Sequence, residues 1–186
     1  MWFWGLRKPS AVRHNGRRVS EILQEHAQWT RGVGGARADL SRADLSRMDL
    51  RGVNLHGANL AGARLEGSDL RRAKLGAADL RGANLRRADL RNTDLTEANL
   101  SGADLTQAQA SGVEFFRTDL TGAVFHRASL RAANFRNAKL AGADFLGADL
   151  TTAILREADL QGAKLDAANL TDALLPGGAP HHARVS

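Results

Sequence analysis

The sequence lacks cysteine and tyrosine, and it has only 3 prolines, 3 tryptophans and 6 phenylalanines in 186 residues. The missing cysteine excludes disulfides, thiolate metal sites and a cysteine nucleophile. These few aromatic side chains cannot fill an ordinary hydrophobic core. Leucine and alanine must therefore fill most of it. No apolar run approaches the roughly 18 residues of a membrane-spanning helix, and the opening MWFWGLRKPS places its charges after the apolar cluster, unlike a secretory signal. We expect a cytoplasmic protein.

The net charge of +6 is unevenly distributed along the chain. Residues 1–35 carry +4, residues 36–175 carry +1 and residues 176–186 carry +1. The long central segment is therefore nearly neutral, and most of the basic character belongs to the two ends.

A five-residue period runs through that central segment. Every fifth position from 40 to 175 is Leu or Phe except Ala110, Ala stands two residues earlier at 22 of 28 positions, and Asp or Asn stands between them at 18 of 28. A straight α-helix turns about 500° in five residues and would spread the leucines around all its sides. A strand would send successive leucines to opposite faces. The period instead fits a polygonal coil in which each pentapeptide forms one side and points its leucine inward.

The uninterrupted repeat A(D/N)LXX resembles the pentapeptide repeat family. That resemblance implies an all-β solenoid, a right-handed quadrilateral parallel β-helix with four pentapeptides per coil and about seven coils. Residues twenty apart then lie in one column, which predicts that Phe115 stacks on Phe135 and Phe125 on Phe145. Ala110 directly precedes Phe115, and we interpret the pair as volume compensation in a closely packed core.

The chain divides into four predicted parts. Residues 1–18 form a basic aromatic N-terminal arm, 19–35 a capping helix and linker, 36–175 the repeat domain, and 176–186 a flexible C-terminal tail. The capping helix is predicted to begin at an N-cap Ser20 and to end at Gly32, with Trp29 as its anchor on the first coil. Its buried stripe comprises Val19, Ile22, Leu23 and His26. The His-x-x-Trp spacing resembles a leader found in bacterial members of the family.

The recurrent Asp and Asn residues are interpreted as bend residues that accept hydrogen bonds from their own backbone. Two columns of opposite charge nevertheless form candidate interaction residues, as a solvated ladder or as a surface for a charged partner: Asp49, Asp69 and Asp89 beside Arg51, Arg71 and Arg91. Outward apolar residues occur late in the chain, and Phe116, Ile154 and Leu174 are predicted to fall on one side. This patch is covered either by the tail or by a second copy, as a homodimer through the C-terminal coils.

The N-terminal arm combines aromatic and basic residues, namely Trp2, Phe3, Trp4, Arg7 and Lys8. One hypothesis is that the arm docks at the cytoplasmic face of an anionic membrane or on a membrane complex. The alternative is that the arm is disordered or covers the cap of the rod.

We predict no catalytic, cofactor or metal site, because the histidines are scattered and a filled solenoid leaves no substrate cavity. Direct nucleic-acid binding is disfavoured because the early coils lack stacking aromatics. The sequence therefore predicts a non-enzymatic scaffold that presents the side faces of a rigid rod to a protein partner. The resemblance implies an alternative, which is protection or inhibition of DNA gyrase or topoisomerase IV by mimicry of DNA. The nearly neutral body lacks the acidic surface that such mimicry needs.

Overall fold

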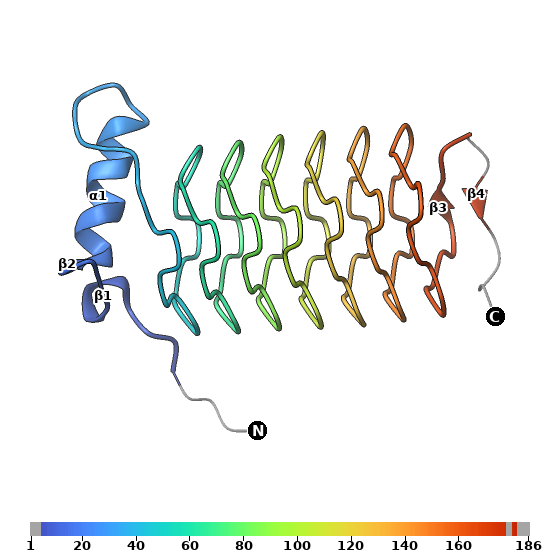
Figure 1. The fold of residues 1–186 in the computed structure, drawn as a ribbon, viewed down its shortest axis with the longest axis horizontal. Helices are drawn as coiled ribbons and strands as arrows, with labels where there is room; N and C mark the ends of the chain where they lie inside the picture. The colour runs from blue at the N-terminus through green and yellow to red at the C-terminus, as the bar shows by residue number, and fades with distance from the viewer. Residues whose placement is uncertain (1–4, 178–179, 182–186) are drawn as a thin grey trace.

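The computed structural model describes residues 5–177 and 180–181 and shows an elongated rod with a helix at one end (Figure 1). The N-terminal end contains the 3-10 helix η1 (Pro9–Ala11), the strands β1 (Arg13–His14) and β2 (Arg17–Arg18), and the helix α1 (Val19–Trp29). The strands β3 (Ala173–Leu174) and β4 (Pro180–His181) lie at the other end. Between α1 and β3 the chain winds as a solenoid.

Parallel bridges between residues twenty apart hold the solenoid together, from Asp39↔Asn59 to Ile154↔Leu174. The Leu40 N–H, for example, donates to the Asn59 carbonyl at 2.8 Å, and the Asn59 N–H donates to the Ala38 carbonyl at 2.9 Å. Twenty residues are four pentapeptides, so each turn of the solenoid has four sides, as the resemblance implies.

Each corner follows the same local geometry. The second residue after every inward leucine or phenylalanine has a positive φ, and the values range from 52° at Arg47 to 96° at Gly177. On the strand before the corner, every Asp or Asn of the repeat accepts a hydrogen bond from the backbone N–H two residues later, as Asp39 does from Ser41 at 3.1 Å. The interpretation of these residues as bend residues is confirmed.

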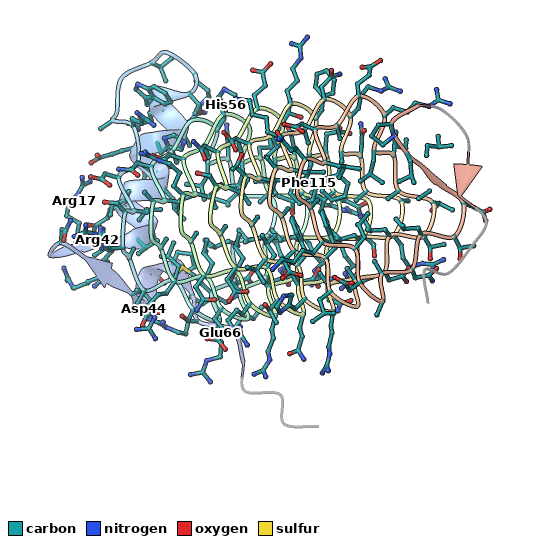
Figure 2. The ribbon with its side chains drawn as sticks, turned by 45° about the vertical axis from the view of Figure 1, so that its right-hand side comes forward. Arg17, Arg42, Asp44, His56, Glu66 and Phe115 are labelled. Atoms are coloured by element: carbon teal, nitrogen blue, oxygen red, sulfur yellow. The ribbon has the colours of Figure 1, made fainter. Side chains whose placement is uncertain are left out.

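The core is filled by the inward leucines and by a central stack of phenylalanines. Phe115 stacks on Phe135 with ring centroids 4.8 Å apart, and Phe125 stacks on Phe145 at the same distance. The two stacks meet edge to face, with 6.1 Å between the rings of Phe115 and Phe125. Figure 2 shows Phe115 midway along the rod, while Arg42, Asp44 and Glu66 lie at its surface. The predicted columns are confirmed.

The helix α1 lies across the start of the solenoid (Figure 1). The predicted N-cap Ser20 is wrong: α1 begins at Val19, because the Glu21 carboxylate accepts the Arg18 N–H at 3.1 Å and starts the first turn earlier. The predicted stripe is buried at Val19, Ile22 and His26, and Leu23 is partly buried. The helix ends at Trp29, and Gly32 follows with φ 70°.

His26 joins the helix to the first coil. Its Nδ1 accepts the Ala38 N–H at 3.0 Å, and its ring stacks on Trp29 with centroids 5.3 Å apart. Burial lowers the pKa of His26, so the neutral ring keeps the lone pair that this bond needs. The tip of the Trp29 ring lies over the corner at Gly57. The His-x-x-Trp spacing therefore places one residue in a hydrogen bond to the coil and the other against its corner.

The remaining terminal segments are more ordered than expected from the sequence. Strands β1 and β2 pair as a hairpin through Asn15 and Gly16, which have φ values of 48° and 80°. Arg7 forms a parallel bridge with Met48. In the segment predicted as a flexible tail, β4 returns to pair antiparallel with β3.

Candidate interaction surface

Three rungs of one side carry a ladder of paired aspartates and arginines. Arg51 Nε and Nη2 donate to the two carboxylate oxygens of Asp49, both at 2.8 Å. Arg71 pairs with Asp69 in the same way at 2.9 and 2.6 Å, and Arg91 pairs with Asp89 at 2.9 and 2.6 Å. The rungs are also linked to one another, because Arg51 Nε lies 3.6 Å from Asp69 and Arg71 Nε lies 3.5 Å from Asp89.

These pairs set the ionisation of the ladder. Hydrogen bonds from Arg51 and Lys8 hold the pKa of Asp49 well below its usual range. Burial alone would raise the pKa of Asp89, but the hydrogen bonds from Arg91 outweigh it and lower the pKa. Hydrogen bonds to the paired aspartates in turn raise the pKa of Arg51, Arg71 and Arg91. All of these groups are therefore charged at neutral pH.

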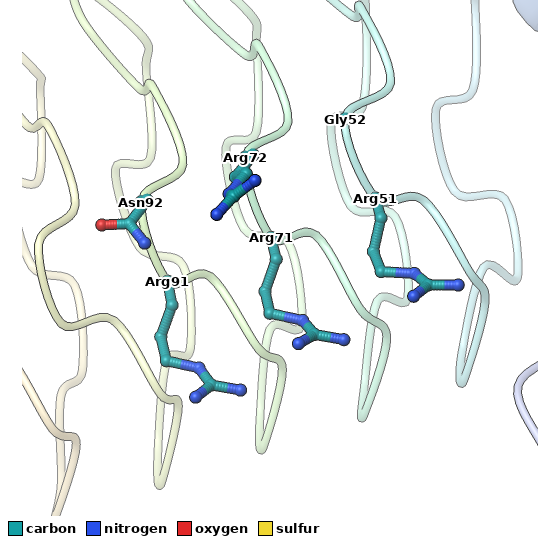
Figure 3. A pocket seen from close by; sticks show the side chains of 6 residues that line it. All are labelled: Arg51, Gly52, Arg71, Arg72, Arg91 and Asn92. Carbon is teal, nitrogen blue, oxygen red and sulfur yellow. The ribbon is translucent and has the colours of Figure 1, made fainter.

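A shallow groove of about 610 Å³ runs along the arginine edge of the ladder (Figure 3). It is lined by Arg51, Gly52, Arg71, Arg72, Arg91 and Asn92. In Figure 3 the side chains of Arg51, Arg71 and Arg91 run side by side in one direction, and Arg72 extends from the adjacent corner. From the sequence we predicted the three columnar arginines but missed Arg72, Gly52 and Asn92. The twenty-residue period was the signal that could have placed them in the next column.

The arm residues Arg7 and Lys8 contact this side of the rod. Lys8 Nζ donates to Asp49 at 3.1 Å, and Arg7 Nη1 donates to the Ser46 carbonyl at 3.1 Å and lies 3.5 Å from Asp44. Both cations thus pair with the first coil. The predicted aromatic residues Trp2, Phe3 and Trp4 lie outside the described residues.

The residues of the predicted apolar patch differ in their surroundings. Ile154 and Leu174 are bridged to each other and are half-buried. Phe116 lies below the guanidinium of Arg117, which is 5.0 Å from the ring centroid. Leu146, another apolar residue of the late coils, is 46% exposed.

Residues 5–177 and 180–181 lack two other kinds of site. These residues contain no group of three or more His, Cys, Asp or Glu side chains that could hold a metal ion. No helix among them combines the length and the apolar character needed to cross a bilayer.

Comparison with known proteins identifies the family. The family of pentapeptide repeats matches residues 38–76, 73–109, 98–137, 111–145 and 133–172. The chain belongs to this family. Pentapeptide repeat proteins are right-handed β-helix solenoids, and they are generally non-enzymatic structural or protein-binding proteins.

Solved structures of other members resemble this chain. QnrB1, a plasmid-mediated fluoroquinolone resistance protein, is 23% identical over 75% of this chain and 70% of its own, with a TM-score of 0.70. HetL, which is involved in heterocyst differentiation regulation in the cyanobacterium Nostoc sp. strain PCC 7120, is 30% identical over 77% of this chain and 87% of its own, with a TM-score of 0.38. No curated protein matches the chain.

Proposed function

We propose that this pentapeptide repeat protein is a non-enzymatic protein-binding scaffold. In this proposal a rod of about seven coils, closed at its N-terminal end by α1, presents its side faces to a protein partner. The filled core supports it, because leucines such as Leu80, Leu100 and Leu120 are fully buried and occupy the space in which a substrate would have to bind. The family's general character supports it as well.

The observation that carries the proposal is the ladder of Asp49, Asp69 and Asp89 with Arg51, Arg71 and Arg91. Two-point pairing to a carboxylate restrains each arginine before a partner arrives, so less side-chain entropy is lost on binding. The arginine side chains are 52%, 40% and 49% exposed, so a partner can reach them.

Retention of partners from a lysate of the source cells tests the role of this face. The immobilised protein is compared with the variant Arg51→Gln/Arg71→Gln/Arg91→Gln and with the matched control Arg42→Gln/Arg47→Gln/Arg127→Gln, which removes the same charge from other corners. We expect proteins that are retained by the wild type and the control but released from the ladder variant. Equal retention by all three would exclude this face, and no retention above empty beads would contradict the scaffold proposal.

A second candidate is action on DNA gyrase. The fold shared with QnrB1, a fluoroquinolone resistance protein, favours it, whereas the charge of +1 on residues 36–175 opposes mimicry of DNA. A supercoiling titration with and without a quinolone tests it. Inhibition or drug protection at low micromolar protein would favour gyrase over an unidentified partner, and no effect would remove this candidate.

The two ends of the chain complete the proposal. We place the protein in the cytoplasm, with a homodimer through the C-terminal coils around Ile154 and Leu174, and with peripheral membrane contact through the arm as a further alternative. Flotation with anionic vesicles, with and without the arm of residues 1–18, tests the membrane contact. Flotation that does not depend on these residues would contradict it.

A further inference from the structure

The three ladder arginines each keep a second binding edge free. Their Nε and one Nη2 hydrogen are committed to Asp49, Asp69 and Asp89. Within the described part of the chain, the Nη1 groups of these arginines donate no hydrogen bond. A guanidinium has five donors in a rigid fork. The free edge of each arginine can therefore donate two parallel hydrogen bonds to one further oxyanion.

Arg72 adds a fourth cation to the groove, and no ion pair in the described part of the chain neutralises it. It is exposed at the corner between the rungs of Arg51 and Arg91, and it forms no ion pair with any residue that the structure describes. Asp49, Asp69 and Asp89 balance the other three arginines of the groove. The lining of the groove contains no acidic residue, so its electrostatic preference is for an anion.

The acidic residues on either side of the groove determine which kind of anion can bind there. The row of Asp49, Asp69 and Asp89 borders it on one side, and the neighbouring column continues from Lys74 into Asp94 and Glu114. A nucleic-acid duplex carries phosphates along both strands and would bring some of them against these carboxylates. An extended polypeptide is narrow enough to lie along the arginines without covering the acidic rows.

We propose that the groove of Arg51, Arg71, Arg72, Arg91 and Asn92 binds a carboxylate-rich extended segment of the protein partner. This inference rests on the proposed scaffold function and names the chemistry that the scaffold recognises. The side chains of the segment pair with the free guanidinium edges of the ladder and with Arg72, while Gly52 leaves the entrance of the groove without a side chain.

Fluorescence anisotropy with a fluorescein-labelled hexaglutamate peptide tests the proposal, at 50 mM salt with hexaglutamine as the neutral control. Arg72→Gln removes a guanidinium that has no partner in the described part of the chain, so the fold is unaffected. Arg127→Gln is the matched control, because Arg127 also lies at a corner, with φ 54° against 58° for Arg72. We expect Arg72→Gln to weaken hexaglutamate binding about five- to tenfold and Arg127→Gln to change it less than about twofold.

Three results would overturn the proposal: no binding of hexaglutamate to the wild type, equal effects of the two substitutions, or tighter binding of labelled oligothymidylate that Arg72→Gln weakens. The last result would assign the groove to phosphate. Failure here is distinct from failure of the scaffold function. A retained protein partner that does not respond to Arg72→Gln would leave the scaffold standing and exclude only this groove.

Discussion

At the scale of single residues, the corners impose a demand that the sequence meets unevenly. Each corner residue has a positive φ, and many of these residues are not glycine, as Arg42, Ala77 and Thr152 show. Left-handed backbone costs an L-residue roughly 1–2 kcal/mol. The strain is tolerated because hydrogen bonds to the next coil hold the corner in place. The Thr152 N–H, for example, donates to the Thr171 carbonyl at 2.9 Å.

The first prediction concerns this strain. Gly142 has φ 66°, and an added Cβ would meet nothing within 4 Å, so Gly142→Ala should cost about 1 kcal/mol of unfolding free energy through backbone strain alone. Thr152→Gly should act in the opposite direction by a similar or smaller amount, because it relieves a β-branched residue at φ 58°. Urea denaturation monitored by circular dichroism measures both. A stabilising Gly142→Ala would contradict the argument.

The second prediction concerns acid. The pKa values of Asp49 and Asp89 are lowered in the folded chain. Their ion pairs therefore stabilise the fold above the unfolded value of about 3.9, and this stabilisation is lost as the pH falls through the lower folded values. We expect the melting temperature to fall below about pH 4 and to fall less steeply in Asp49→Asn/Asp89→Asn, since Asn serves at equivalent bends. At pH 7 that variant should lose less than about 1 kcal/mol per pair.

Asp159→Asn is the control for the acid prediction. It removes a carboxylate that makes the same backbone bend and takes part in no ion pair in the described part of the chain. The control should keep the acid sensitivity of the wild type. An equal flattening in both variants would mean that the ladder is not its source.

At the scale of elements, the sequence predicted the buried stripe of α1 because helical spacing depends only on local order. It did not predict the start of α1, since Glu21 bonds backward to Arg18 across a boundary that the stripe does not mark. The β1–β2 hairpin was missed although Asn15-Gly16 is a strong turn signal. Two strands of two residues each show too little alternation of polar and apolar side chains to be recognised. The turn was therefore the only signal for the hairpin.

The third prediction tests how α1 is docked. A Cβ on Gly35 would lie 2.1 Å from the Glu25 carbonyl oxygen, whereas a Cβ on Gly34 would meet nothing within 4 Å. Both glycines have positive φ, so both alanine variants carry backbone strain and only Gly35→Ala also displaces the helix. We expect Gly35→Ala to lose at least about 2 kcal/mol more than Gly34→Ala, with a change in Trp29 fluorescence. Equal losses would show that the loop accommodates the methyl group without moving α1.

At the scale of the whole molecule, the sequence predicted the solenoid because the same five-residue pattern recurs along residues 36–175, so each repeat supports the same interpretation. The candidate surface was predicted less completely. The columns of Asp49 and Arg51 follow from the period together with the four-sided coil that the family resemblance implies. The groove depends on which donors remain free after Asp49, Asp69 and Asp89 have been paired. Identifying the free donors requires the side-chain geometry, which the period does not supply.

The last prediction uses the twenty-residue rung. Deletion of residues 96–115 removes one complete turn, joins Leu95 to Phe116 and leaves every later column in register, with Leu95 placed over Phe135. In a solenoid each turn contacts only its neighbours, so the shortened chain should fold with the same circular dichroism per residue. Its urea m-value should be lower, in proportion to the surface removed. Deletion of residues 96–113 is the matched control, because it takes the columns out of register and places Leu95 two residues before Phe115, in the buried position that Ala fills in most repeats. If both chains fold, or if neither does, the register of the stacked columns does not decide whether the rod folds.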